Sequence, residues 1–141
     1  MIDKISEGNI IKFMELNIIE APTENKLPFE PQVAILKALT HPTRIAILYL
    51  LRDAEHCVCH LTAYLGLRQA YVSQQISVLR EAGLIQDRRD GWNIYYRVVN
   101  PLIFEVLDAV HGLTHENIPL PTKSQSACPC PHCSSKAGVT S

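Results

Sequence analysis

The chain has 141 residues, of which 47% are hydrophobic, so one domain with extensions and a buried core is expected. Its net charge of -1 at pH 7 is not the strongly basic balance of many nucleic-acid-binding proteins. No apolar run of about 18 residues, the length of a transmembrane helix, occurs in the sequence. The first residues mix charged with apolar side chains, which is not typical of a secretion signal. We therefore expect a cytoplasmic protein without a membrane partner.

Residues 1–27 are predicted to form an N-terminal helix followed by a connector. Apolar side chains recur there at roughly helical spacing, and three prolines then fall between residues 21 and 31. We expect this segment to contribute to a dimer interface. The apolar positions are Ile2, Ile5, Ile10, Phe13 and Met14.

Two amphipathic helices are predicted next, from residue 32 to about 39 and from about 42 to 52. The pair His41-Pro42 separates them, because the residue before a proline is disfavoured in a helical conformation. Thr40 is expected to cap the second helix, and Pro42 suits its first turn.

A third helix over about 58–65 and a fourth over about 69–82 are joined by a short turn at Gly66, a residue preferred just past a helix end. In the fourth helix, Val72 and Ile76 recur at the spacing of an inward-facing side. The intervening residues are predicted to face outward: Gln69, Tyr71, Ser73, Gln74 and Gln75.

Two strands, 84–87 and 94–99, are predicted around Arg88-Arg89-Asp90-Gly91, because Asp-Gly is a strong hairpin signal. A last helix follows over about 101–114. The predicted fold class is mainly α with a small β-hairpin wing. This is a winged helix-turn-helix of order α-α-α-α-β-β-α over residues 28–115, with the N-terminal helix as an extra element. Residues 116–141 are rich in proline and hydroxyl side chains, which predicts a flexible cysteine-containing tail.

This layout predicts binding to double-stranded DNA. In such a unit one face of a helix packs on the core while the other enters the major groove, where glutamine amides pair with adenine edges. A solvated helix has no reason to be followed by a basic hairpin, which would grip phosphates or the minor groove. Residues 66–99 hold five arginines and three acidic residues, a local charge of +2. The candidate DNA-binding residues are Arg68, Gln69, Tyr71, Ser73, Gln74, Gln75, Arg88 and Arg89.

Five cysteines fall in two clusters, an odd count that argues against a disulfide scaffold and favours metal or redox chemistry. On a regular helix, residues i and i+2 point about 200° apart, so Cys57 and Cys59 could not both bind one ion there. Metal capture is therefore expected to oppose the start of helix 58–65. The candidate metal ligands are Cys57, Cys59, Cys128, Cys130 and Cys133, with His60 and His132 as weaker ones.

The blocks LKALTHPTRIAILYLL and LTAYLGLRQAYVSQQISVLREAGLIQDRRDGWNIYYRVVNP are similar to the ArsR/SmtB family of metal-responsive repressors. The resemblance covers roughly residues 32–115. It implies a homodimer formed through the first and last helices, and an inverted-repeat operator that is released when a metal or metalloid binds. The family's arsenic, antimony, cadmium and lead sensors carry a Cys-Val-Cys that Cys57-Val58-Cys59 matches.

Three positions depart from the family pattern. Arg68 stands where a serine is common, so the usual helix cap is missing, at a cost of about 1 kcal/mol. Ala70 replaces a common proline, and His60 replaces a common aspartate. A second family site, at the dimer helices, is not expected, because three of its four matching positions cannot serve as ligands: Asn100, Leu102, Leu113 and Glu116.

The expected effector is a thiophilic ion: As(III), Cd(II), Pb(II) or Zn(II). Arsenite takes three sulfurs and the others three or four soft ligands, so the tail cysteines would complete the site or form one of their own. Two alternatives remain open. One is a thiol redox or reactive-sulfur sensor, with a bridge to the tail favoured over a strained Cys-x-Cys ring. The other is a metal-sequestering or trafficking protein that uses the tail. No catalytic motif is visible, so an enzyme is not expected.

Overall fold

The computed structural model describes residues 27–117 and 119. The predicted N-terminal helix and the tail residues Cys128, Cys130, His132 and Cys133 lie outside the described residues. In chain order the elements are α2 (Glu30–Ala38), α3 (Pro42–Leu50), β1 (His56–Cys57), α4 (Val58–Leu65), α5 (Gln69–Glu81), β2 (Ile85–Asp90), β3 (Asn93–Val98) and α6 (Leu102–Thr114). The predicted winged helix-turn-helix is confirmed, and the predicted helix limits agree with these bounds to within two residues.

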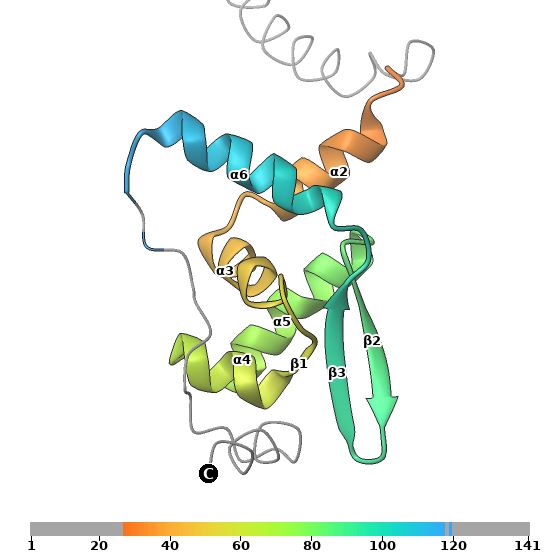
Figure 1. The fold of residues 1–141 in the computed structure, drawn as a ribbon. Helices are drawn as coiled ribbons and strands as arrows, with labels where there is room; N and C mark the ends of the chain where they lie inside the picture. The colour runs from red at the N-terminus through yellow and green to blue at the C-terminus, as the bar shows by residue number, and fades with distance from the viewer. Residues whose placement is uncertain (1–26, 118, 120–141) are drawn as a thin grey trace, which may run out of the picture. The chain divides into compact units, whose positions relative to one another are not determined.

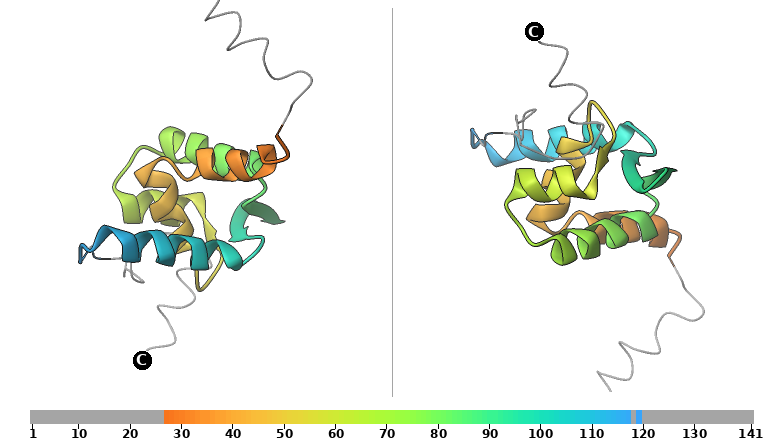
Figure 2. Two further views of the ribbon diagram at one scale, coloured as in Figure 1. Left: turned by 90° about the horizontal axis from the view of Figure 1, so that it is seen from above. Right: turned by 90° about the horizontal axis from the view of Figure 1, so that it is seen from below.

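The helices surround α3. Figures 1 and 2 show α6 and α5 on opposite sides of it, with the β2–β3 hairpin extending away from the helices. The core forms where the apolar faces of α3, α4, α5 and α6 meet the first residue of the hairpin. The largest fully buried side chains are Ile47, Leu48, Leu61, Val72, Leu79 and Ile85. The core therefore holds the helix-turn-helix pair α4–α5 against the base of the wing.

The start of α3 is capped by His41, not by Thr40 as predicted. The backbone of His41 is extended (φ -135°, ψ 128°), as a residue before proline must be, and its Nδ1 accepts a hydrogen bond from the Thr43 amide at 3.2 Å. Thr40 instead donates its hydroxyl proton to the Lys37 carbonyl at 2.8 Å. The prediction missed this because histidine is not among the common capping residues.

A short strand that was not predicted joins the hairpin. β1 pairs antiparallel with β3, which gives a three-stranded sheet in the order β1-β3-β2. Two residues are too short a run for strand periodicity to be visible in a sequence. Arg88 and Arg89 also lie within β2 rather than in the turn, which is made at Gly91 with φ +60°. The cysteine segment is thus part of the wing's sheet.

The end of α3 is tied to α6 by an ion pair between Arg52 and Asp108. Arg52 Nη1 donates to Asp108 Oδ1 at 3.0 Å and Nη2 to Oδ2 at 2.6 Å, and the Tyr49 hydroxyl donates to Oδ1 at 3.4 Å. The hydrogen bonds from Arg52 hold the pKa of Asp108 below its ordinary value. Both side chains are well exposed, so solvent weakens the pair.

Replacing Asp108 with Asn is expected to lower the melting temperature slightly at pH 7 and not at pH 2. A depressed carboxyl pKa contributes stability above its unfolded value, near 4, and that contribution is lost as the pH falls through the folded pKa. Thermal melts of both proteins at the two pH values measure this. Glu105→Gln, on the exposed side of α6, is the control. Equal melting temperatures at pH 7 would contradict the prediction.

Candidate DNA interface and cysteine pair

The DNA-facing candidate is the exposed side of α5. Four residues in its first half are exposed: Gln69, Ala70, Ser73 and Gln74. The preceding Arg68 is exposed too, and it caps the helix only through its extended backbone, with no side-chain hydrogen bond. The missing cap expected from the sequence is therefore confirmed. The polar side chains among these residues can donate hydrogen bonds, and the amides and the hydroxyl can also accept them, as contacts to base edges require.

Gln75 was predicted to face outward, and this is wrong. It is 7% exposed, and its Oε1 accepts a hydrogen bond from Arg44 Nη1 at 2.9 Å. Arg44 also donates to the backbone carbonyls of Lys37 and Ala38. The spacing carries the signal, because Gln75 lies three residues after Val72 and on the same helix face. Gln75 thus links α5 to α3 and to the end of α2.

Tyr71 lies at the edge of the exposed side and is half-buried. Its hydroxyl oxygen is 3.1 Å from His41 Nε2. His41 Nδ1 accepts from the Thr43 amide, so in the neutral ring Nε2 carries the proton and donates it to Tyr71. The cap of α3 therefore also holds the aromatic ring of the recognition helix in place.

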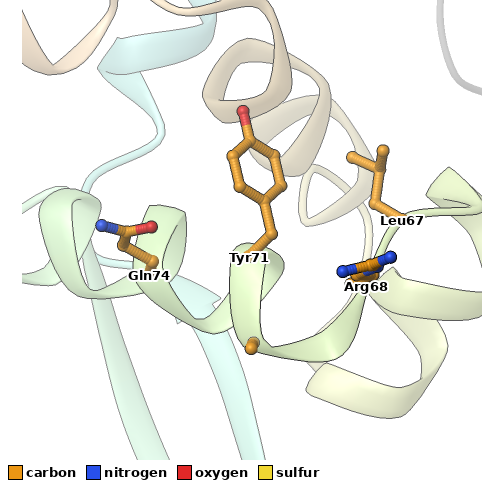
Figure 3. A pocket seen from close by; sticks show the side chains of 5 residues that line it. Leu67, Arg68, Tyr71 and Gln74 are labelled. Carbon is orange, nitrogen blue, oxygen red and sulfur yellow. The ribbon is translucent and has the colours of Figure 1, made fainter.

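A shallow hollow of about 580 Å³ runs along the start of α5. Figure 3 shows Tyr71 standing between Gln74 on one side and Leu67 with Arg68 on the other. Leu67, Ala70 and the Tyr71 ring make its wall largely apolar. Its lining residues are Leu67, Arg68, Ala70, Tyr71 and Gln74.

The two wing arginines differ in their surroundings. Arg88 lies against the Glu55 carboxylate, where its Nε donates to Oε2 at 3.2 Å and its Nη2 contacts Oε1. Asp90 is 3.6 Å away, and the guanidinium sits 5.2 Å from the centre of the Tyr95 ring. The hydrogen bond to Glu55 raises the pKa of Arg88. Arg89 is exposed on the opposite face of β2, because successive strand residues alternate.

Cys57 and Cys59 are joined by a disulfide, with their Cα atoms 5.4 Å apart. Cys57 is the N-cap of α4, with an extended backbone (ψ 162°), and its Sγ accepts a hydrogen bond from the His60 amide at 3.4 Å. The two sulfurs therefore meet while helix 58–65 is formed. The sequence argument that they could not both bind one ion assumed that both residues are helical, whereas only Cys59 is.

Two histidines flank the pair. The rings of His56 and His60 stack with centroids 4.0 Å apart and planes 8° apart, and His60 is buried. Within the part of the chain that the structure describes, no group of three or more histidine, cysteine or carboxylate side chains is arranged to hold a metal ion. The structure thus brings the two sulfurs together, and the described residues do not supply a complete set of ligands for a metal ion.

The cysteine pair is in register with the wing. Cys57 pairs with Tyr95 across β1 and β3, and Tyr95 pairs with Arg88 across β3 and β2. Cys57 and Tyr95 form a small buried cluster with Cys59 packed against it, separate from the main core. A change in the chemical state of the two sulfurs therefore acts on the Tyr95 ring, which also contacts the Arg88 guanidinium.

The family model "Bacterial regulatory protein, arsR family" matches residues 41–87. A biofilm growth-associated repressor of Agrobacterium fabrum is 32% identical over 109 residues, 77% of this chain and 92% of that protein. The arsenic resistance transcriptional regulator ArsR1 of Pseudomonas putida is 40% identical over 77 residues, 54% of this chain and 59% of that protein.

Two solved structures share the fold. The crystal structure of Rv0081 from M. tuberculosis is 35% identical with a TM-score of 0.57, covering 63% of this chain and 91% of that one. The homodimeric winged helix-turn-helix DNA-binding domain Mb0332 from Mycobacterium bovis is 24% identical with a TM-score of 0.57, and the match covers 68% of this chain and 89% of that one.

No single helix among the described residues is long and apolar enough to cross a membrane. Only α2 and α3 taken together, as a bent pair, have the length and composition that a span requires. By its fold, the family model that it matches and these relatives, the chain belongs to the ArsR/SmtB family of DNA-binding transcriptional repressors.

Proposed function

We propose that the chain is a homodimeric repressor that binds an inverted-repeat operator in the cytoplasm and releases it when a thiophilic ion binds Cys57 and Cys59. The observation that carries this proposal is the meeting of the two sulfurs at the start of α4, in register with the wing. The effector is As(III), Cd(II), Pb(II) or Zn(II). The relative from Pseudomonas putida, named for arsenic resistance, supports this class of ion.

The dimer surface is the outer side of α6. Its residues Leu102, Val106, Val110 and Leu113 lie in one stripe and are 42% to 76% exposed. The adjoining side of the helix already packs on the core through Ile103, Phe104 and Leu107. An apolar stripe of this length on a helix marks an interaction surface. The homodimeric neighbour supports a second copy as the partner, and residues 1–27 are proposed to add to the interface.

Val110→Glu is expected to convert the dimer into a monomer, because it places a charge at the centre of an apolar stripe. Light scattering behind size exclusion measures the mass, which should fall from about twice 15.8 kDa to 15.8 kDa. Glu105→Gln, on the same helix, should leave the dimer intact. A wild-type protein that already runs as a monomer would overturn the dimer proposal.

The third ligand of the ion comes from the tail. The described residues hold no complete metal site, arsenite requires three soft donors, and the other ions need three or four. Cys128, Cys130 and Cys133 are the other thiols of the chain. We assign one or more of them to the site, from the same protomer or from its partner, and His60 and His132 are weaker candidates.

Release is transmitted through the wing's sheet. Cys57 and Cys59 would hold the ion, and the position of Cys57 Sγ, which accepts from the His60 amide, would then be set by the ion as well as by the helix end. Cys57 packs on Tyr95, and the Arg88 guanidinium lies over the ring of the same tyrosine. Binding of the ion would thereby act on β3, the wing strand that pairs with Cys57. This route differs from the one that the sequence predicts, in which metal capture opposes the start of helix 58–65.

A second candidate is a thiol redox repressor, which the disulfide between Cys57 and Cys59 favours. Two thiols would lose two protons and two electrons to form the bond, with a peroxide reduced to water or alcohol as the oxidant. A disulfide removes both thiolates, so the oxidised protein could not bind the ion at this site.

Titration of reduced full-length protein separates the two functions. Arsenite, Cd(II), Pb(II) and Zn(II) are added in turn while operator binding is followed by fluorescence anisotropy and thiolate-to-metal absorption in the ultraviolet. We expect at least a tenfold loss of DNA affinity with one ion. A tail-truncated protein reports whether the tail adds sulfur. Release by peroxide but by none of the ions would select the redox function instead.

A further inference from the structure

The hollow at the start of α5 is lined by the exposed Arg68 and Ala70 and by Tyr71, a bulky residue at the edge of the recognition face. The Tyr71 ring is held on one side by His41, whose own ring is held by the cap of α3. Because the Tyr71 side chain is already held in place, DNA binding does not have to supply the free energy for ordering it.

The hollow lies beside the exposed polar side chains of α5, which we expect to face the major groove of DNA. Gln74 and Arg68 line its two ends, and Gln69 and Ser73 are exposed beside it on the same helix. The first turns of a recognition helix are the part that reaches base edges. In a complex of this kind the hollow would face the base edges on the floor of the major groove rather than the phosphate backbone.

The major groove displays one apolar group on its base edges, the C5 methyl of thymine. Polar base edges would lose hydrogen bonds against Leu67, Ala70 and the face of Tyr71, whereas a methyl loses none. We propose that this hollow reads a thymine in each operator half-site, with Tyr71 and Ala70 as the specificity-determining residues.

The inference rests on the proposed homodimer and its operator. Arg68 and Gln74 frame the thymine by contacting the neighbouring phosphate or base, and Tyr71 supplies the apolar surface. Burying one methyl is worth about a fourfold change in affinity, and two symmetry-related methyls about fifteenfold. The effect is thus large enough to set a preference at one position of each half-site.

The test uses a duplex selected from a randomised library by the full-length protein. Each thymine of the selected site is replaced in turn by deoxyuridine, which lacks only the methyl. At one symmetry-related pair of positions the wild type should lose about fifteenfold in affinity. The variant Tyr71→Ala should bind the two duplexes equally. Tyr71→Phe keeps the ring and should keep most of the discrimination.

A second variant guards against misfolding of the first. Ala70→Met fills the hollow from an exposed position with a good helix former, does not touch His41, and should also abolish the discrimination. Arg89→Ala is the matched control, expected to weaken both duplexes equally. Discrimination that is absent in the wild type, or unchanged in both hollow variants, would overturn the proposal. Failure to select any duplex would instead contradict operator recognition itself.

Discussion

Cys57→Ser is expected to leave operator binding within a fewfold of wild type and to abolish release by the effector ion. Serine keeps an oxygen that can accept from the His60 amide, so the cap of α4 survives, and serine is among the favoured capping residues. The ion loses one of its two helix-end sulfurs. A response of at least tenfold in the wild type should therefore fall to less than twofold. Anisotropy titrations of reduced protein with and without the ion measure both quantities.

Cys59→Ser is the matched variant, because it removes the partner sulfur without touching the cap. It should lose the same response. If Cys57→Ser still releases DNA at the wild-type ion concentration, the switch does not use this pair. If Cys59→Ser responds fully while Cys57→Ser does not, the cap alone transmits the signal and no ion bridges the two sulfurs.

The fold could be predicted because its signals are local. Glycines at 66, 83 and 91 adopt positive φ at the ends of helices and in the hairpin turn, where side chains with a Cβ are strained. The spacing of the apolar residues in α5 predicted every residue on its buried side except Gln75. Gln75 was misjudged because polarity was given more weight than its position. Its burial depends on Arg44, thirty-one residues away, and no local pattern carries such a pair.

The candidate site was less predictable, because its most important contacts join residues that are far apart in the sequence. The cap at His41 became visible only with the extended backbone before Pro42. The cysteines could meet only because Cys57 stands outside the helix that Cys59 begins. The position of Cys57 depends on a two-residue strand that pairs with the far side of a hairpin. The order of side chains along one segment therefore suggested the chemistry but not its geometry.

Arg89→Ala is expected to weaken operator binding about tenfold, and Arg88→Ala by much less. Exposed Arg89 can neutralise a phosphate in each half-site, and each lost phosphate contact lowers the salt dependence of binding by about one unit of slope. Arg88 is already neutralised by Glu55 and lies near Asp90, so DNA gains less from its charge. Binding isotherms at several salt concentrations measure both the affinity and the slope.

Glu55→Gln separates the charge of Arg88 from its place in the wing. Without the carboxylate the guanidinium is available to a phosphate, so this variant should bind the operator more tightly than wild type. It should also respond less to the effector, because Arg88 would then be held by DNA as well as by Tyr95. Equal losses for Arg88→Ala and Arg89→Ala, with no gain for Glu55→Gln, would mean that both arginines grip phosphates. The ion pair with Glu55 would then not limit the contact between Arg88 and DNA, and the prediction would be wrong.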